Sequence, residues 1–143
     1  MSTAERLAVI TTGFGVTHHV DHVLRYDHSG WPFKPEITPF TYSLLIYVVI
    51  ALVFALRRFP RVRVALAGVL FLFPTVAHMT LETPADQFRT WAEMPHVNLL
   101  HASVPALGIA AVGVTVLLSL FALATCVSFW REATTTNERR STE

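Results

Sequence analysis

Long uncharged stretches alternate along this chain with short charged connections. Asp, Glu, Lys and Arg are absent from residues 40–56, 64–77 and 97–130, where apolar side chains predominate. A shorter apolar run occupies residues 7–16. Because a run of about 18 or more apolar residues matches the thickness of a bilayer core, this pattern predicts an all-α integral membrane protein.

The pattern predicts one membrane domain that covers the whole chain of 143 residues and contains four transmembrane helices. Thr38 and Pro39 suit the N-cap and first position of a helix, and Pro60 separates the two helices that follow. A short interfacial helix is predicted around Ala85–Glu93, and a mobile polar tail over residues 131–143. The predicted spans are approximately residues 4–26, 39–58, 62–82 and 97–130.

The first predicted span contains the shortest apolar run of the four. Crossing a bilayer takes about 20 residues, so this helix spans only if its histidines lie inside the bilayer or at its edge. An amphipathic helix lying in the membrane interface is the alternative. No small-residue cleavage motif follows the apolar run Leu7–Val16, which argues against a signal peptide.

The arginines predict the orientation of the bundle. The connection between the second and third spans contains four arginines and no acid, so the positive-inside rule places it in the cytoplasm. Four spans then place both termini in the cytoplasm, together with eight of the 11 basic residues. We therefore expect a multi-pass cell-membrane protein, a four-helix transmembrane bundle with cytoplasmic N- and C-termini.

This orientation brings every histidine to the outer end of the bundle. Three lie near the end of the first helix, within the stretch THHVDHVLRYDH, and others lie at the outer ends of the third and fourth helices. His28 and His96 are predicted to be ordinary loop residues. The seven histidines are His18, His19, His22, His28, His78, His96 and His101.

The spacing of these side chains predicts a metal site. His18 and His22 are four residues apart, as are His78 and Glu82, so each pair shares one helix face. Such pairs commonly supply two ligands to one ion. Imidazole and carboxylate ligands suit Zn, Cu or Fe. The predicted ligands are His18, His22, His78 and His101, assisted by Glu82 or Asp21.

Some of these residues have other interpretations. Asp21 lies four residues before Arg25, so it forms an intrahelical salt bridge or orients a histidine instead of binding metal. His19 is expected to face lipid headgroups or a neighbouring group. Pro105 lies four residues after His101 inside the predicted fourth helix, where it would leave the His101 carbonyl without its helical hydrogen bond. The tryptophans are expected to be interface anchors.

Three functions fit these observations. An ion with an open coordination position would make the protein a metal-dependent membrane oxidoreductase or hydrolase acting on a lipid-soluble substrate. A single b-type haem with two axial histidines, for example His22 with His78 or His101, would make it an electron-transfer subunit. A histidine network without a cofactor would fit a non-catalytic accessory subunit of a membrane complex, or a homo-oligomer.

Composition narrows the choice of partners. Apolar residues make up 52% of the chain and charged residues 15%, against about 25% charged residues in a typical soluble domain. The formal net charge is +1 and Lys34 is the single lysine, so no nucleic-acid surface is expected. The lone cysteine, Cys126, excludes an internal disulfide and is expected to be a packing residue.

Overall fold

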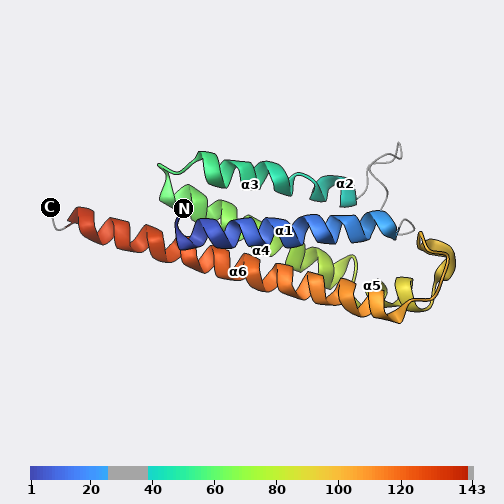
Figure 1. Ribbon diagram of the computed structural model, residues 1–143. Coiled ribbons are helices and arrows are strands. Elements are labelled where there is room, and N and C mark those ends of the chain that lie inside the picture. The colour runs from blue at the N-terminus through green and yellow to red at the C-terminus, as the bar shows by residue number, and fades with distance from the viewer. Residues whose placement is uncertain (26–38, 142–143) are drawn as a thin grey trace.

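The computed structural model describes residues 1–25 and 39–141 of the chain, and the side chains of these residues except 39–40 and 136–141. Helices make up nearly all of this part, and it contains no strand. The predicted loop positions of His28 and Trp31 lie outside the described residues. The helices are α1 (Thr3–Leu24), α2 (Pro39–Ser43), α3 (Ile46–Ala55), α4 (Pro60–Thr80), α5 (Pro84–Ala92), the 3₁₀-helix η1 (Pro95–Val97) and α6 (Pro105–Ser141) (Figure 1).

Local sequence accounts for where α1, α4 and α5 begin. Ser2 and Glu5 form a capping box at the start of α1, and Thr83 and Asp86 form another at the start of α5. Pro60 is the first residue of α4, where its missing N–H costs nothing. The helices predicted over residues 4–26 and 62–82, and the short helix near residue 85, are therefore confirmed as helices.

The second predicted helix is interrupted. Residues 39–58 form α2 and α3, which are separated by a turn at Leu44 and Leu45. The prediction of one continuous helix was wrong here, and neither proline nor glycine marks the break.

The fourth predicted helix, residues 97–130, differs from the observed helix α6 at both ends. It begins at Pro105 instead of Val97, because buried Asn98 organises a turn: its side-chain amide donates to the carbonyls of Thr90 and Ala102, and its carbonyl accepts from Leu100 N. Pro105 starts α6 and does not interrupt it. At the other end α6 continues to Ser141, so the described part of the predicted tail 131–143 is helical; no proline or glycine interrupts it.

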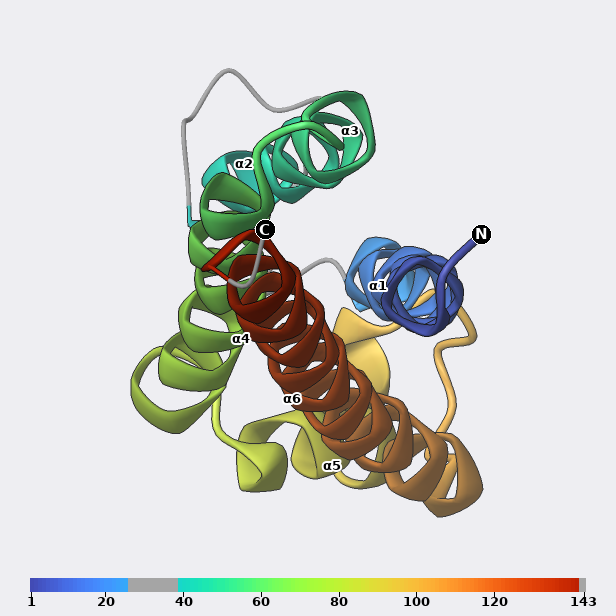
Figure 2. The same cartoon turned by 90° about the vertical axis from the view of Figure 1, so that its left-hand side faces the viewer.

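The long helices lie side by side. α1 and α4 pack along α6, and α5 packs against the first turns of α6 (Figures 1 and 2). α3 packs mainly against α4 and only slightly against α1. The buried cluster near the N-terminus combines small residues, which permit close helix approach, with larger apolar ones: Ala4, Ala8, Val53, Ala67, Leu70 and Phe129.

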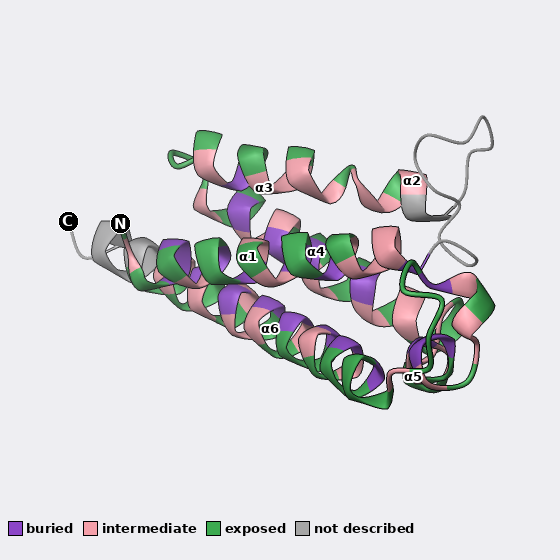
Figure 3. Cartoon of the chain, turned by 45° about the vertical axis from the view of Figure 1, so that its right-hand side comes forward, coloured by how far each residue is buried: buried purple, intermediate pink, exposed green. Residues whose placement is uncertain are grey.

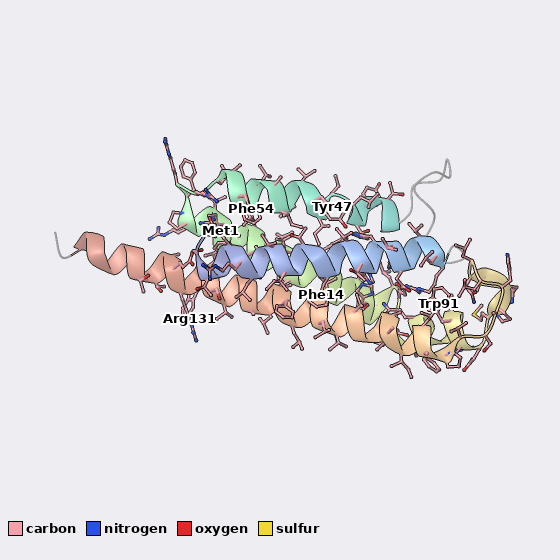
Figure 4. All side chains as sticks on the ribbon, viewed as in Figure 1. Met1, Phe14, Tyr47, Phe54, Trp91 and Arg131 are labelled. Atoms are coloured by element: carbon pink, nitrogen blue, oxygen red, sulfur yellow. The ribbon has the colours of Figure 1, made fainter. Side chains whose placement is uncertain are left out.

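A network of charges closes the end of the molecule where both termini lie (Figures 1 and 4). Buried Arg63 donates to Glu5 over 3.0 Å and to the carbonyl of Val53 over 3.0 Å, and its guanidinium lies 4.3 Å from the centre of the Phe129 ring. Glu5 also pairs with Arg57. The arginine-rich connection between α3 and α4 is therefore tied to the first turn of α1.

Two of the described helices are long and apolar enough to cross a membrane: residues 60–80 and 105–135. A shorter apolar helix covers residues 41–55. Large apolar side chains are exposed on the outer surfaces of α4 and α6, and buried positions face inward (Figure 3). Examples of exposed side chains are Val69, Leu72, Val76, Ile109, Val116 and Leu120.

Candidate metal centre

Four potential ligand side chains meet at the end of the molecule opposite the termini. His18 and His22 come from the last two turns of α1, His78 comes from the last turn of α4, and Glu82 follows that helix. Each offers one ligand atom, and these atoms all lie within 4.8 Å of one another. The i, i+4 spacing supplies each pair, and the parallel placement of α1 and α4 against α6 brings the two pairs together.

Three separations within the group are close to those between the ligand atoms of a tetrahedral ion. Nε2 of His22 lies 3.0 Å from Nε2 of His18 and 3.1 Å from Oε2 of Glu82. Nδ1 of His78 lies 3.7 Å from the same Glu82 oxygen. Ligand atoms about 2.0–2.1 Å from a tetrahedral zinc ion are about 3.4 Å apart. These three separations bracket that value, and all the ligand atoms lie within 4.8 Å of one another, so the side chains would have to adjust their positions to surround an ion.

Hydrogen bonds alone do not satisfy all three of the atoms His18 Nε2, His22 Nε2 and Glu82 Oε2 at once. A hydrogen on Nε2 of His22 can point at Glu82 or at His18, but it serves only one of these two contacts well. If His18 donates instead, Nε2 of His22 and the Glu82 carboxylate face each other as two acceptors. A metal cation could accept lone pairs from all three atoms at once.

A chain of hydrogen bonds behind the site orients His18. Nδ1 of His18 lies 3.2 Å from the Thr115 hydroxyl, which donates to Oε1 of Gln87 over 3.0 Å. The Gln87 amide nitrogen lies 3.0 Å from Nδ1 of His78, so this nitrogen would give up its contact with Gln87 in order to bind an ion. The single hydrogen of the Thr115 hydroxyl has two oxygen acceptors, Gln87 Oε1 and the Ala111 carbonyl, and when it points at either of them Nδ1 of His18 is the donor to Thr115. That tautomer leaves Nε2 of His18 with a lone pair directed into the site.

Arg25 holds Glu82 in its ionised form. The fully buried guanidinium bonds Oε1 of Glu82 over 2.5 Å, which leaves Oε2 directed at His22. Burial alone would raise the pKa of the Glu82 carboxyl. The hydrogen bond from His22 and the charge of Arg25 outweigh burial and hold that pKa well below its usual range. Glu82 is therefore a carboxylate at neutral pH.

The structure separates Asp21 from the group. Both carboxylate oxygens of Asp21 are used: Arg25 bonds Oδ2, and Nε1 of Trp91 donates to Oδ1 over 2.8 Å. Asp21 thus forms the salt bridge that its spacing predicts. Trp91, expected to be an interface anchor, is buried against the end of α1 (Figure 4).

Two of the remaining predicted histidines also lie elsewhere. His101 is exposed in the loop before α6, with a positive φ of 48°, and is not a member of the group, because α6 begins four residues after it. His96 is exposed, as predicted. The structure therefore brings together His18, His22, His78 and Glu82 but neither His101 nor Asp21.

His19 joins α1 to the α2–α3 segment. Its ring nitrogens lie 2.7 Å from the Tyr47 hydroxyl and 2.9 Å from the Ser43 hydroxyl. Both partners come from a segment that otherwise contacts α1 little. His19 thus has a neighbour, one of the two environments expected for it, and it fixes one side of the site.

Sequence reasoning missed Thr115, Gln87 and the bridging role of Arg25. Thr115 carried one usable signal, because it is a polar residue deep in the uncharged stretch 97–130, where polar side chains often bond between helices. Nothing in the sequence marked Gln87 as part of the site. It lies in a polar segment, and its burial follows from the packing of α5 on α6.

Comparison with known proteins gives no assignment for this site: no protein-family model, curated protein or solved structure matches the chain.

Proposed function

We propose that this chain is a multi-pass membrane protein that binds one transition-metal ion through His18, His22, His78 and Glu82, near the outer face of the membrane. The observation that carries the proposal is the convergence of four ligand atoms within 4.8 Å. The imidazole and carboxylate set favours Zn, Cu or Fe. Hydrogen-bonded partners behind the ligands, Thr115 at the far nitrogen of His18 and Arg25 at the far oxygen of Glu82, are typical of metal sites.

The membrane assignment is supported by the outer surface of the helices. The two longest apolar helices, α4 and α6, expose Leu72, Val76, Val116 and Leu120, which in water would form large apolar patches. The arginine-rich connection and both termini lie together at one end (Figure 1). The proposed topology has α1, α2–α3, α4 and α6 as the four spans, with that end in the cytoplasm.

The geometry favours an ion over haem. A b-type haem requires two axial ligands on opposite faces of a flat macrocycle. The ring centres of His22 and His78 are 6.2 Å apart, but the His18 ring lies 4.6 Å and 4.5 Å from them, in the plane that a macrocycle between the two rings would occupy. All four ligand residues also line a cavity, so an ion held there would be open to a small molecule. That access supports a metal-dependent oxidoreductase or hydrolase.

The test is to purify the protein in detergent, measure its metals by mass spectrometry and record its absorption spectrum. We expect about one equivalent of Zn, Cu or Fe without a Soret band. A Soret band would replace this proposal with the haem subunit. If neither metal nor haem is bound after reconstitution with each ion, the metal-binding proposal would be replaced by that of a non-catalytic accessory subunit of a membrane complex.

A matched pair of threonines on α6 tests the support behind the ligands. Thr115→Val removes the hydroxyl that orients His18, so we expect metal affinity to fall about 10- to 100-fold. Thr125→Val removes a similarly buried hydroxyl, which bonds Thr11 over 3.0 Å far from the site, and should leave metal affinity unchanged. Competition with a chelator measures both. Equal affinities for the two variants would contradict the assigned role of Thr115.

A further inference from the structure

A cavity of about 570 Å³ lies between the α2–α3 segment and the pair α1 and α4, and the metal ligands form one part of its wall. Small-molecule sites commonly enclose about 300–1,000 Å³. The cavity forms because α3 packs against α4 but touches α1 little, while His19 bridges the gap to Ser43 and Tyr47. It is partly open to the surroundings of the protein.

The wall of this cavity changes character along the helix axes. Most of the groups toward the outer end are polar, with Leu81 an apolar exception: His18, His19, His22, Ser43, His78 and Glu82. The groups nearer the middle of the bundle are apolar or small: Gly15, Ile46, Phe73, Pro74 and Leu118. On α1, Gly15 and His22 are seven residues apart, which corresponds to about 10 Å along a helix.

A lipid leaflet is polar at its surface and apolar in its interior. In the proposed topology the polarity of the cavity wall changes in the same direction. A molecule with a polar head at the outer end and an apolar tail toward the membrane interior would meet matching surface along its length. A polar head beside the ligand set needs an oxygen that can bind a cation or accept a hydrogen bond. A tail of about 10 Å fits a single medium-length chain.

We propose that the cavity binds a single-chain amphiphile whose hydroxyl or carboxylate head lies at the His18–His22–His78–Glu82 site and whose tail lies against Ile46, Phe73 and Leu118. The position of the head rests on the proposed metal function. The position of the tail rests only on the cavity. This assigns the substrate class of the site as medium-chain alcohols or fatty acids taken up from the bilayer.

The experiment is photolabelling of the protein in lipid nanodiscs, with and without bound metal. The probes are a medium-chain fatty acid and the corresponding alcohol, each with a diazirine on the terminal carbon. We expect label on Ile46 or Leu118, assigned to the residue by fragmentation of the labelled peptides, and we expect excess unlabelled acid or alcohol to compete. The head that labels more strongly identifies the natural head group. Labelling confined to lipid-facing positions such as Val116 and Leu120 would overturn the proposal.

Two substitutions on α3 provide a matched comparison. Ile46→Trp fills the apolar end of the cavity and should lower this labelling about tenfold or more, because the indole occupies the space of the tail. Val48→Trp adds the same side chain at an exposed position outside the cavity and should leave labelling unchanged. Equal labelling of the two variants would refute the site.

Further controls separate the two proposals. Gly15→Leu is a second filling variant, because a Cβ at Gly15 meets no atom closer than Leu118 at 4.0 Å. It applies if Ile46→Trp fails to fold. Cavity labelling of a protein that binds no metal would remove the metal proposal and keep the amphiphile. Bound metal without cavity labelling would remove the amphiphile proposal and keep the metal proposal.

Discussion

Replacing His22 or His78 by alanine is expected to abolish stoichiometric metal binding. Each substitution removes one of the four ligands from a group whose atoms lie within 4.8 Å of one another. Loss of an outer-shell partner already costs about 10- to 100-fold in affinity, so loss of a direct ligand should cost more. Metal analysis after gel filtration, together with chelator competition, measures the effect.

His101→Ala is the matched control for these variants. His101 is a predicted ligand that the fold places in an exposed loop, so its removal should leave metal content and affinity unchanged. The comparison separates the position of the site from a general effect of losing an imidazole. Full metal content in both His22→Ala and His78→Ala, or equal loss in His101→Ala, would show that the ion is held elsewhere.

Replacing Arg25 by methionine is expected to lower the free energy of unfolding by about 3–5 kcal/mol. Arg25 is fully buried and bonds two carboxylates, Asp21 on its own helix and Glu82 after α4. Its removal would leave two largely buried negative charges without their cation, and breaking a buried ion pair from one side is strongly destabilising. Denaturant unfolding of the detergent-solubilised protein, followed by helical circular dichroism, measures the change.

Arg89→Met is the matched control for Arg25→Met. Arg89 also pairs with an acid four residues away, but both members of the Arg89–Glu93 pair are more than half exposed. Exposed pairs contribute little to stability, so this substitution should barely move the unfolding curve. A loss of stability at Arg25 no larger than at Arg89 would mean that the bridge from α1 to Glu82 does not hold the site together.

The bridging role of Arg25 shows the limit of reasoning from spacing. The i, i+4 rule pairs Arg25 with Asp21, and that pair exists. The same rule cannot reveal that Arg25 reaches Glu82, which is 57 residues away. That contact exists because α1 and α4 both pack along α6, which brings the residues that follow the two helices together.

The boundaries of the helices show a similar division. Capping boxes and prolines mark the starts of α1, α4 and α5 in the sequence, because they act within a single turn. The start of α6 depends on buried Asn98, which accepts from or donates to four backbone groups of the surrounding loop. An apolar stretch does not reveal that one polar residue within it organises a turn.

The sequence by itself determined most of the uncharged helical stretches, the two ligand pairs four residues apart, and the cluster of arginines in one short connection. These are properties of neighbouring residues on one helix, and local geometry is enough to produce them. Only the tertiary structure decided that His78 and Glu82 meet His18 and His22, that His101 and Asp21 stay apart from them, and that Thr115 and Gln87 support the group. Those choices depend on how the helices pack against one another, and packing joins residues that no local pattern relates.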